Sequence, residues 1–289
     1  LMMRGENMSK KTRQTISVVL RYAVLIAVGV VMFYPMLWMV GASLKADNNE
    51  IYSTISFIPK HPSFQAYVKG WTATGFNFSH FMINTYLIVL PKVVGAVVSS
   101  VITAYGFSRF QFVGKTFLFA VLMSTLFLPQ VVLNIPQFLL FTGIGWVDTY
   151  KPLVVPAFFA NEPYFVFMLV QFMRSVSREM EEAAEIDGCN SFQRLIYIMT
   201  PIVKPAIVSC ALFQFMWSSN DFQGPLIYIN TVSKYPASLG LRLIADSETG
   251  FEWNKILALS VISILPTLIV FFMAQDQFVE GIAAGGVKG

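Results

Sequence analysis

The most informative segment of the chain reads Arg174-Ser-Val-Ser-Arg-Glu-Met-Glu-Glu-Ala-Ala-Glu-Ile-Asp-Gly188-Cys-Asn-Ser-Phe-Gln-Arg-Leu-Ile-Tyr-Ile-Met-Thr-Pro201. Ser177 is a candidate N-cap for a short helix, and the acidic residues that follow suit the positive end of a helix dipole. Gly188 stands where a helix ends in a left-handed residue. Asn190, followed three residues later by Gln193, predicts a reciprocal cap on a second helix. The segment therefore predicts two short helices that meet at a glycine.

The first of these helices is acidic and the second is amphipathic. Within nine residues the first carries Glu179, Glu181, Glu182, Glu185 and Asp187. Ala183 and Ala184 add a patch of small residues that allows close approach. An apolar face at helical spacing marks the second helix: Phe192, Leu195, Ile196 and Met199. The charge pattern alone leaves two interpretations, a solvated helix at a membrane surface or a docking helix for a soluble partner.

Long apolar stretches flank this segment on both sides. Of the 289 residues, 55% are hydrophobic and 12% are charged, about half the charged fraction of an ordinary soluble domain. This composition excludes a disordered chain and argues against a soluble enzyme. A membrane-spanning helix needs about 20 mostly apolar residues. The chain offers six such stretches: Ile16–Ser43, Phe81–Phe107, Thr116–Phe141, Pro152–Met173, Ile202–Ile229 and Lys255–Ala274.

The distribution of Lys and Arg predicts which side of the membrane each loop faces. Six spans place both termini on one side. With that side in the cytoplasm, the inner segments hold twelve Lys and Arg residues and the outer segments seven, with Lys92 inside a span. Both termini are therefore expected to be cytoplasmic. The positive-inside loops also explain the net charge of +4 without a nucleic-acid partner.

The expected organisation is a single membrane domain with short ends. Residues 1–15 form a cytoplasmic N-terminal segment, residues 16–274 form the six-helix domain, and residues 275–289 form a cytoplasmic tail. The loop at 177–201 belongs to the domain. Cys189 falls in the cytoplasm and Cys210 in the membrane, so no disulfide is expected.

No catalytic or metal-binding motif stands out. Gly114-Lys115-Thr116 resembles the end of a phosphate-binding loop, but Arg109 occupies the position of the required earlier glycine. His61 and His80 are isolated residues of an outer loop, without the spacing of metal ligands. No metal and no cofactor is expected in this chain.

Polar side chains inside the apolar spans are the remaining signal, because they are costly in lipid and usually face a cavity or a partner. The candidates for a substrate pathway are Lys92, Asn161, Glu162, Gln214, Trp217, Asn220 and Asp221. Amides and carboxylates hydrogen-bond sugar hydroxyls, and Trp217 or Phe222 can stack on a pyranose ring. The alternative is structural: Lys92 pairs with Glu162 or Asp221, or Asn220-Asp221 caps or breaks the fifth span.

The loop resembles the signature of the inner-membrane permease subunits of binding-protein-dependent ABC importers. That signature is Glu-Ala-Ala, three residues, Gly, nine residues, Ile, one residue, Leu, Pro. It is matched here by Glu182-Ala183-Ala184, Gly188, Ile198 and Pro201, with Thr200 in place of Leu. The chain also resembles the smaller permease of maltose-type carbohydrate importers over nearly its whole length. The further matching pieces are Pro35, Trp38, Ser43-Leu44-Lys45, Asn84-Thr85, Ala104-Tyr105, Ser108-Arg109, Ile135-Pro136, Trp217, Asn220-Asp221, Pro225-Leu226 and the tail from Gly281 to Gly289.

The resemblance implies an all-α membrane protein with six transmembrane helices, the type I ABC importer permease fold, with cytoplasmic coupling helices between spans four and five. It implies a second, homologous permease, two ATPase subunits that bind ATP and Mg²⁺, and a solute-binding protein outside the bacterial cytoplasmic membrane. The residues expected to couple to the ATPases are Glu182, Ala183, Ala184, Asp187, Gly188 and Phe192. The segment Tyr235–Glu252 should contact the binding protein, and the C-terminal tail should reach toward the ATPases.

The expected function is therefore a non-enzymatic permease subunit that carries an oligosaccharide across the lipid bilayer. Lys92 stands where an apolar run is usual in the family, so an acidic, uronate-containing sugar is one option. A permease for another solute, such as glycerol-phosphate, polyamine or phosphate, is an alternative, because the loop motif is shared. A different class is an ion-coupled secondary transporter in which Glu162 and Asp221 relay protons.

Overall fold

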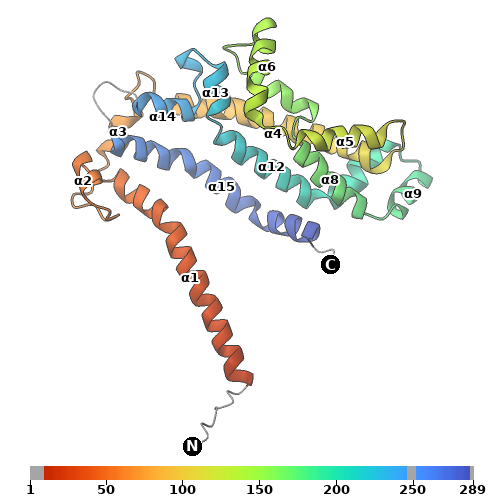
Figure 1. Ribbon diagram of the computed structural model, residues 1–289, viewed down its shortest axis with the longest axis horizontal. Helices are drawn as coiled ribbons and strands as arrows, with labels where there is room; N and C mark the ends of the chain where they lie inside the picture. Colours follow the sequence, from red (N-terminus) through yellow and green to blue (C-terminus); the bar gives the residue numbers. More distant parts are fainter. Residues whose placement is uncertain (1–9, 246–251, 287–289) are drawn as a thin grey trace, which may run out of the picture.

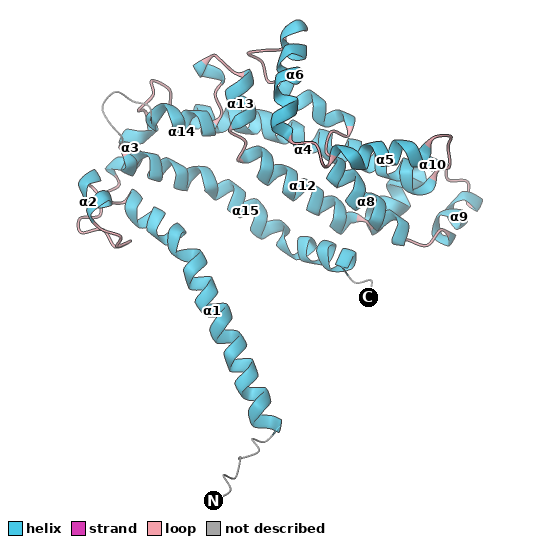
Figure 2. Cartoon of the chain, viewed as in Figure 1, coloured by secondary structure: helices cyan, strands magenta, loops and turns pink. Residues whose placement is uncertain are grey.

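The computed structural model describes residues 10–245 and 252–286, and this part of the chain is almost entirely helical (Figure 2). The elements are α1 (Lys10–Ser43), α2 (Asn48–Ser53), α3 (Gln65–Trp71), α4 (Phe78–Arg109), α5 (Lys115–Thr125), α6 (Gln130–Gly143), α7 (Lys151–Val154), η1 (Val155–Phe159), α8 (Pro163–Ser175), α9 (Glu179–Ile186), α10 (Ser191–Gln193), η2 (Arg194–Met199), α11 (Thr200–Ile202), α12 (Lys204–Ser219), α13 (Gln223–Tyr228), η3 (Val232–Lys234), α14 (Ala237–Ala245) and α15 (Trp253–Gly286). An isolated antiparallel bridge joins Lys45 to Pro62.

Four helical segments are long and apolar enough to cross a bilayer: Gln14–Ser43, Phe78–Arg109, Lys151–Ser175 and Trp253–Phe278. Two further candidates are bent. Lys115–Thr125 and Gln130–Gly143 meet at 102°, and Ser191–Ile202 and Lys204–Ser219 meet at 81°. If each bent pair is counted as one span, the described residues hold six, in the predicted order. The all-helical fold with up to six spans confirms the predicted fold class.

The third, fourth and fifth spans are each interrupted. The third is broken between Thr125 and Gln130, because Pro129 has no N–H with which to continue α5. The fourth breaks after η1 at Ala160, which has a left-handed φ of 52°, and α8 restarts at Pro163. The fifth ends at Ser219 rather than Ile229, and α13 follows as a separate short helix.

The body of the molecule is a bundle in which α12 packs on α15 and α4, and α4 packs on α8 (Figure 1). The main core lies between these helices and includes the fully buried Phe165, Leu169, Met173 and Met199. The α9 loop lies at one end of the bundle, and α2, α3 and α14 lie at the other. The long helices therefore connect two distinct ends of the molecule.

Helix α1 extends away from this bundle (Figure 1). In the most apolar window of its span, no residue is buried inside the molecule. Exposed apolar surface of this extent is not stable in water. We therefore expect lipid or another subunit to cover α1.

Candidate functional site

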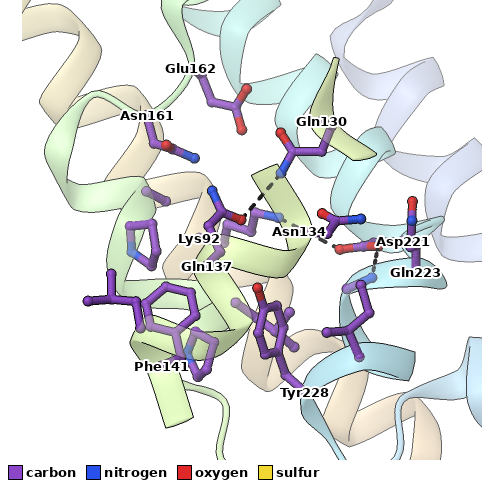
Figure 3. A pocket seen from close by; sticks show the side chains of 17 residues that line it. Lys92, Gln130, Asn134, Gln137, Phe141, Asn161, Glu162, Asp221, Gln223 and Tyr228 are labelled. Carbon is purple, nitrogen blue, oxygen red and sulfur yellow. Dashed lines mark hydrogen bonds and ion pairs between the residues drawn. The ribbon is translucent and has the colours of Figure 1, made fainter. Parts of the chain in front are cut away.

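A polar cavity of about 480 Å³ lies where α4 and α6 meet the breaks in the fourth and fifth spans (Figure 3). Its polar lining residues are Lys92, Gln130, Asn134, Gln137, Asn161, Glu162, Asp221, Gln223 and Tyr228. The apolar part of the wall includes Phe141, Leu153, Pro156 and Ile227. Four of the seven predicted pathway residues are therefore brought together here: Lys92, Asn161, Glu162 and Asp221.

The helix breaks explain why these polar groups face the cavity. Asn161 and Glu162 lie in the non-helical segment between η1 and α8. Asp221 lies between α12 and α13, where its Oδ1 accepts a hydrogen bond from the Gly224 N–H at 3.0 Å. Asn220 is the C-cap of α12, and its Nδ2 donates to the Met216 carbonyl at 2.9 Å. The prediction that Asn220-Asp221 caps or breaks the fifth span is confirmed.

The cavity contains one cation and two carboxylates. Lys92 Nζ lies 3.9 Å from Asp221 Oδ2, so the predicted pairing of Lys92 with Asp221 is confirmed. Among the described residues Glu162 forms no ion pair, although Figure 3 places it in the same cavity.

Tyr228 provides a buried hydroxyl at the cavity wall. The residue is 5% exposed, and its Oη has no hydrogen bond among the described residues. The ring is held by Phe141, with centroids 5.4 Å apart, and by Phe138, at 6.4 Å. Figure 3 shows the hydroxyl directed toward the amide-rich part of the cavity. A buried, unpaired hydroxyl is costly, which makes it a candidate ligand contact.

Sequence reasoning missed the amides of α6. Gln130, Asn134 and Gln137 follow one another at spacings of four and three, so they share one face of the helix. Gln130 Nε2 donates to Gln137 Oε1 at 3.5 Å. That polar stripe in an apolar span was the available signal.

Three predicted pathway residues lie away from this cavity. Gln214 is buried and donates from Nε2 to Ser218 Oγ at 2.9 Å, within α12. Trp217 is half-exposed and stacks on Phe165, with centroids 5.3 Å apart. Asn220 is used as the helix cap described above. None of the three lines the cavity.

At the other candidate site, the α9 loop, the predicted glycine joint and second cap are confirmed. Gly188 has φ +89°, and the Cys189 N–H bonds the Ala184 carbonyl at 2.9 Å. Together with the bond from Gly188 N–H to the Glu185 carbonyl at 3.0 Å, this forms a Schellman motif. Asn190 and Gln193 form the reciprocal capping box. The N-cap of α9 is Arg178 rather than Ser177, although Ser177 Oγ accepts from the Glu179 N–H at 3.3 Å.

The acidic face of α9 is divided between the interior and the solvent. Glu181 is 6% exposed and forms an ion pair with Arg109 at the end of α4. Ala184 is also buried, so the predicted docking patch of small residues includes only Ala183 on the surface. Glu182, Asp187 and Gly188 are exposed.

The predicted apolar face of the second helix is only half correct. Leu195 and Met199 are buried, but Phe192 is 65% exposed and Ile196 is also exposed. The reason is that Arg194–Met199 is a π-helix, whose wider turn changes the angular positions of these residues. Two apolar side chains project from the loop: Phe192, and Ile186 at the end of α9, which is 87% exposed.

The comparisons with known proteins show the family of the chain and its fold. A sequence profile described as "Binding-protein-dependent transport system inner membrane component" matches residues 7–281. The chain belongs to this family of transport components.

Relatives of this permease include two sugar transport components of Bacillus subtilis (strain 168). It is 28% identical over 280 residues to the galactooligosaccharides transport system permease protein GanQ, covering 96% of this chain and 98% of GanQ. It is also 28% identical to the arabinooligosaccharides transport system permease protein AraQ, covering 89% of this chain and 90% of AraQ. A crystal structure of a bacterial ABC transporter involved in the import of the acidic polysaccharide alginate contains a chain with the same fold, with a TM-score of 0.80 and 22% identity. That match covers 95% of this permease and 100% of the solved chain.

The end of the permease opposite α9 is held together by Asp148. Its carboxylate accepts from the N–H groups of Asn230 and Thr231 at 3.0 and 2.9 Å, and from Lys234 Nζ at 2.8 Å. These hydrogen bonds, led by those from Lys234 and Thr231, hold the pKa of Asp148 well below its usual range. The loop before α7 is thereby tied to the segment after α13.

The structure changes one expectation for this end and leaves a second one as a prediction. His80 is not an isolated loop residue, because its Nε2 lies 2.6 Å from the Ser233 carbonyl oxygen, which also accepts from Asn84. The predicted binding-protein loop Tyr235–Glu252 contains helix α14, and its residues 246–251 lie outside the described part of the chain. In the C-terminal tail, residues 287–289 also lie outside it, and α15 continues to Gly286.

Proposed function

We propose that this chain is one of two paired permease subunits of an ABC importer that carries oligosaccharides across the bacterial cytoplasmic membrane. The observation that carries the proposal is the polar cavity at the broken spans of a transport-family membrane component. Hydrogen-bonding groups at membrane depth are kept where they serve a cavity or a pathway. In this proposal a second permease completes the pathway, and a binding protein delivers the sugar.

Energy reaches the pathway through the α9 loop. The contacts proposed for the ATPase subunits are the exposed residues Glu182, Ala183, Asp187, Gly188 and Phe192. Ala184 supports the helix from its buried side instead. Two ATPase subunits bind ATP and Mg²⁺, and this chain supplies no ATPase site. The loop, like both termini, then faces the cytoplasm.

We propose that the oligosaccharide is uncharged. The cavity is lined by five amide side chains, which donate and accept hydrogen bonds as sugar hydroxyls require. The uronate option depends on a free cation, but Lys92 is paired with Asp221 in this cavity. The named substrates of GanQ and AraQ, galacto- and arabinooligosaccharides, agree with this choice. The alginate importer that shares the fold agrees with the uronate alternative instead.

Coupling is tested with the complex purified together with its ATPases and reconstituted in liposomes. Glu182→Lys should abolish the stimulation of ATP hydrolysis by loaded binding protein. Glu179→Lys makes the same charge change on the same helix, outside the proposed contact, and should retain the stimulation. If no ATPase co-purifies and the chain transports in a proton gradient alone, the secondary-transporter alternative is correct.

The substrate class is tested in the same liposomes with a panel of galacto-, arabino- and uronate oligosaccharides. Stimulation by neutral members alone supports the uncharged-sugar proposal. Stimulation by uronates, or by glycerol-phosphate, polyamine or phosphate, would contradict it while leaving the importer assignment intact.

A further inference from the structure

A buried ionic contact joins α9 directly to α4. Glu181 lies in the first turn of α9, and Arg109 is the last residue of α4. Arg109 Nε pairs with Glu181 Oε1, and both side chains are 8% exposed. Tyr105, one turn earlier on α4, donates from its hydroxyl to Glu181 Oε2 at 3.0 Å. Both oxygens of this one carboxylate are therefore held by α4.

Arg109 also binds the linker that leads into α9. Its Nη2 donates to the Val176 carbonyl at 2.9 Å, between α8 and α9. A single guanidinium thus contacts the linker and the helix at once. Because the guanidinium is planar with fixed donor directions, its hydrogen bond to Val176 sets the orientation of the group that pairs with Glu181.

The pair borders a pocket of about 250 Å³ that also reaches Glu182, Glu185 and Arg194. Glu182, the proposed ATPase contact, is exposed, whereas its neighbour Glu181 is buried. Consecutive residues on a helix point about 100° apart. One side of α9 is therefore available to a partner while the adjacent side is fastened to α4.

Helix α4 leads from this contact to the cavity. Lys92 lies 17 residues before Arg109 on the same helix, which is about 25 Å at 1.5 Å per residue. Between the two residues, α4 packs against α8, η1 and α12. A displacement of α9 would therefore act on a helix that lines the cavity.

We propose that Arg109 and Glu181, with Tyr105, form the joint that transmits movement of α9 to α4. They are positioning residues: they touch neither the sugar nor the ATPase, and they make the cavity respond to ATP. This inference rests on the proposed coupling through α9. Coupling between two sites requires an element with two arrangements whose balance both sites can shift. In this proposal that element is α4, which the cavity contacts at Lys92 and α9 contacts at Arg109.

The test measures cavity opening without needing the sugar. Asn134→Cys, on the cavity wall, is introduced into a chain in which Cys189 and Cys210 are replaced by Ser. Its modification by a membrane-impermeant thiol reagent from outside is timed in the ATPase-containing complex, with and without ATP and vanadate. An otherwise unchanged chain should show an ATP-dependent change in rate. Absence of that change would contradict the proposed function itself, not the joint.

Glu181→Gln keeps the size of the side chain and removes its charge. We expect ATPases still to co-purify and to hydrolyse ATP, while the ATP-dependent change in labelling falls on the order of tenfold, within the usual range of coupling between sites. Glu185→Gln is the matched control, because it breaks the ion pair of α9 with Arg194 in η2 rather than the pair with α4. That variant should label like the unchanged chain.

The exchange Arg109→Glu with Glu181→Arg separates coupling from simple stability. Either reversal alone places like charges in contact and should abolish the ATP-dependent change. If the double variant partly regains the ATP-dependent change in labelling rate, the proposed joint is supported. If the double variant does not assemble, Tyr105→Phe replaces it, since it removes one hydrogen bond and should lower the change by a smaller factor than Glu181→Gln. Full retention of the ATP-dependent change in Glu181→Gln would overturn the proposal.

Discussion

At the scale of single residues, Tyr228 is the clearest example of a side chain that the fold alone does not explain. Its ring belongs to an aromatic cluster, but its buried hydroxyl gains nothing from the described protein atoms. Leaving such a group unpaired costs about 1–3 kcal/mol. A phenylalanine would fill the same space without that cost. Tyrosine is explained if a sugar hydroxyl pairs with it during transport.

Tyr228→Phe should therefore leave the thermal stability in detergent unchanged or slightly raised. It should also weaken the apparent affinity of uptake for the sugar. Loss of one hydrogen bond of about 1 kcal/mol corresponds to a rise in KM for uptake of roughly fivefold. Tyr150→Phe is the matched control, because the Tyr150 hydroxyl donates to the Lys234 carbonyl at 3.1 Å. It should lower stability and leave KM unchanged. The reverse pattern would exclude Tyr228 as a ligand contact.

Asp148 is the opposite case, a residue whose groups are all used within the fold. Its pKa is lowered in the folded protein, so its contribution to stability is fully present above the ordinary carboxyl pKa of about 4 and is lost as the pH falls toward the folded value. Asp148→Asn should remove about 1 kcal/mol at pH 5 to 8. Asn tolerates the left-handed backbone found here, at φ +59°, so the loss reports the charge. Melting curves of Asp148→Asn, Lys234→Met and the double variant should be non-additive, and additive losses would contradict the pairing.

At the scale of elements, local signals were predictable and long-range pairings were not. The Gly188 joint and the Asn190 capping box depend on residues fewer than six positions apart, so they could be inferred from spacing alone. The burial of Glu181 depends on Arg109, 72 positions earlier, and nothing in the acidic pattern of α9 distinguishes Glu181 from Glu182. The π-helix at Arg194–Met199 likewise had no sequence signal that separated it from an ordinary helix.

The end of α1 offers a prediction at this scale. A Cβ built on Gly41 would lie 1.7 Å from the Phe57 carbonyl oxygen, a backbone atom that cannot move independently. Gly41→Ala should therefore displace the segment around Phe57 and lower the melting temperature of the complex. Gly29→Ala lies on the same helix with nothing within 4 Å of the added carbon, and should be neutral. If the two substitutions change the melting temperature equally, the close approach at Gly41 does not contribute to stability.

At the scale of the whole molecule, the number of spans followed from composition, but the angles at which they bend did not. Hydropathy cannot tell a straight span from one that bends by 102° near Pro129, because both kinds of span pass the same test of mean hydropathy. The breaks matter most for function, since they place Asn161, Glu162 and Asp221 around one cavity. Intramembrane polarity found those residues but also selected Gln214, whose hydrogen bond stays inside α12.

The orientation of the molecule remains a prediction from Lys and Arg, and it is testable with single cysteines. In a background without Cys189 and Cys210, Val113→Cys places a thiol on the exposed turn before α5, and Thr72→Cys places one after α3, near the other end of the bundle. An impermeant thiol reagent added to intact spheroplasts should label Thr72→Cys and should reach Val113→Cys only after the membrane is opened. The α9 loop lies at the same end as the turn between α4 and α5, because Arg109 at the end of α4 pairs with Glu181. This result would therefore place Glu182 on the side where ATP is available. Labelling of Val113→Cys in intact cells would put α9 outside, where no ATPase could reach it, and would refute the coupling proposal together with the predicted topology.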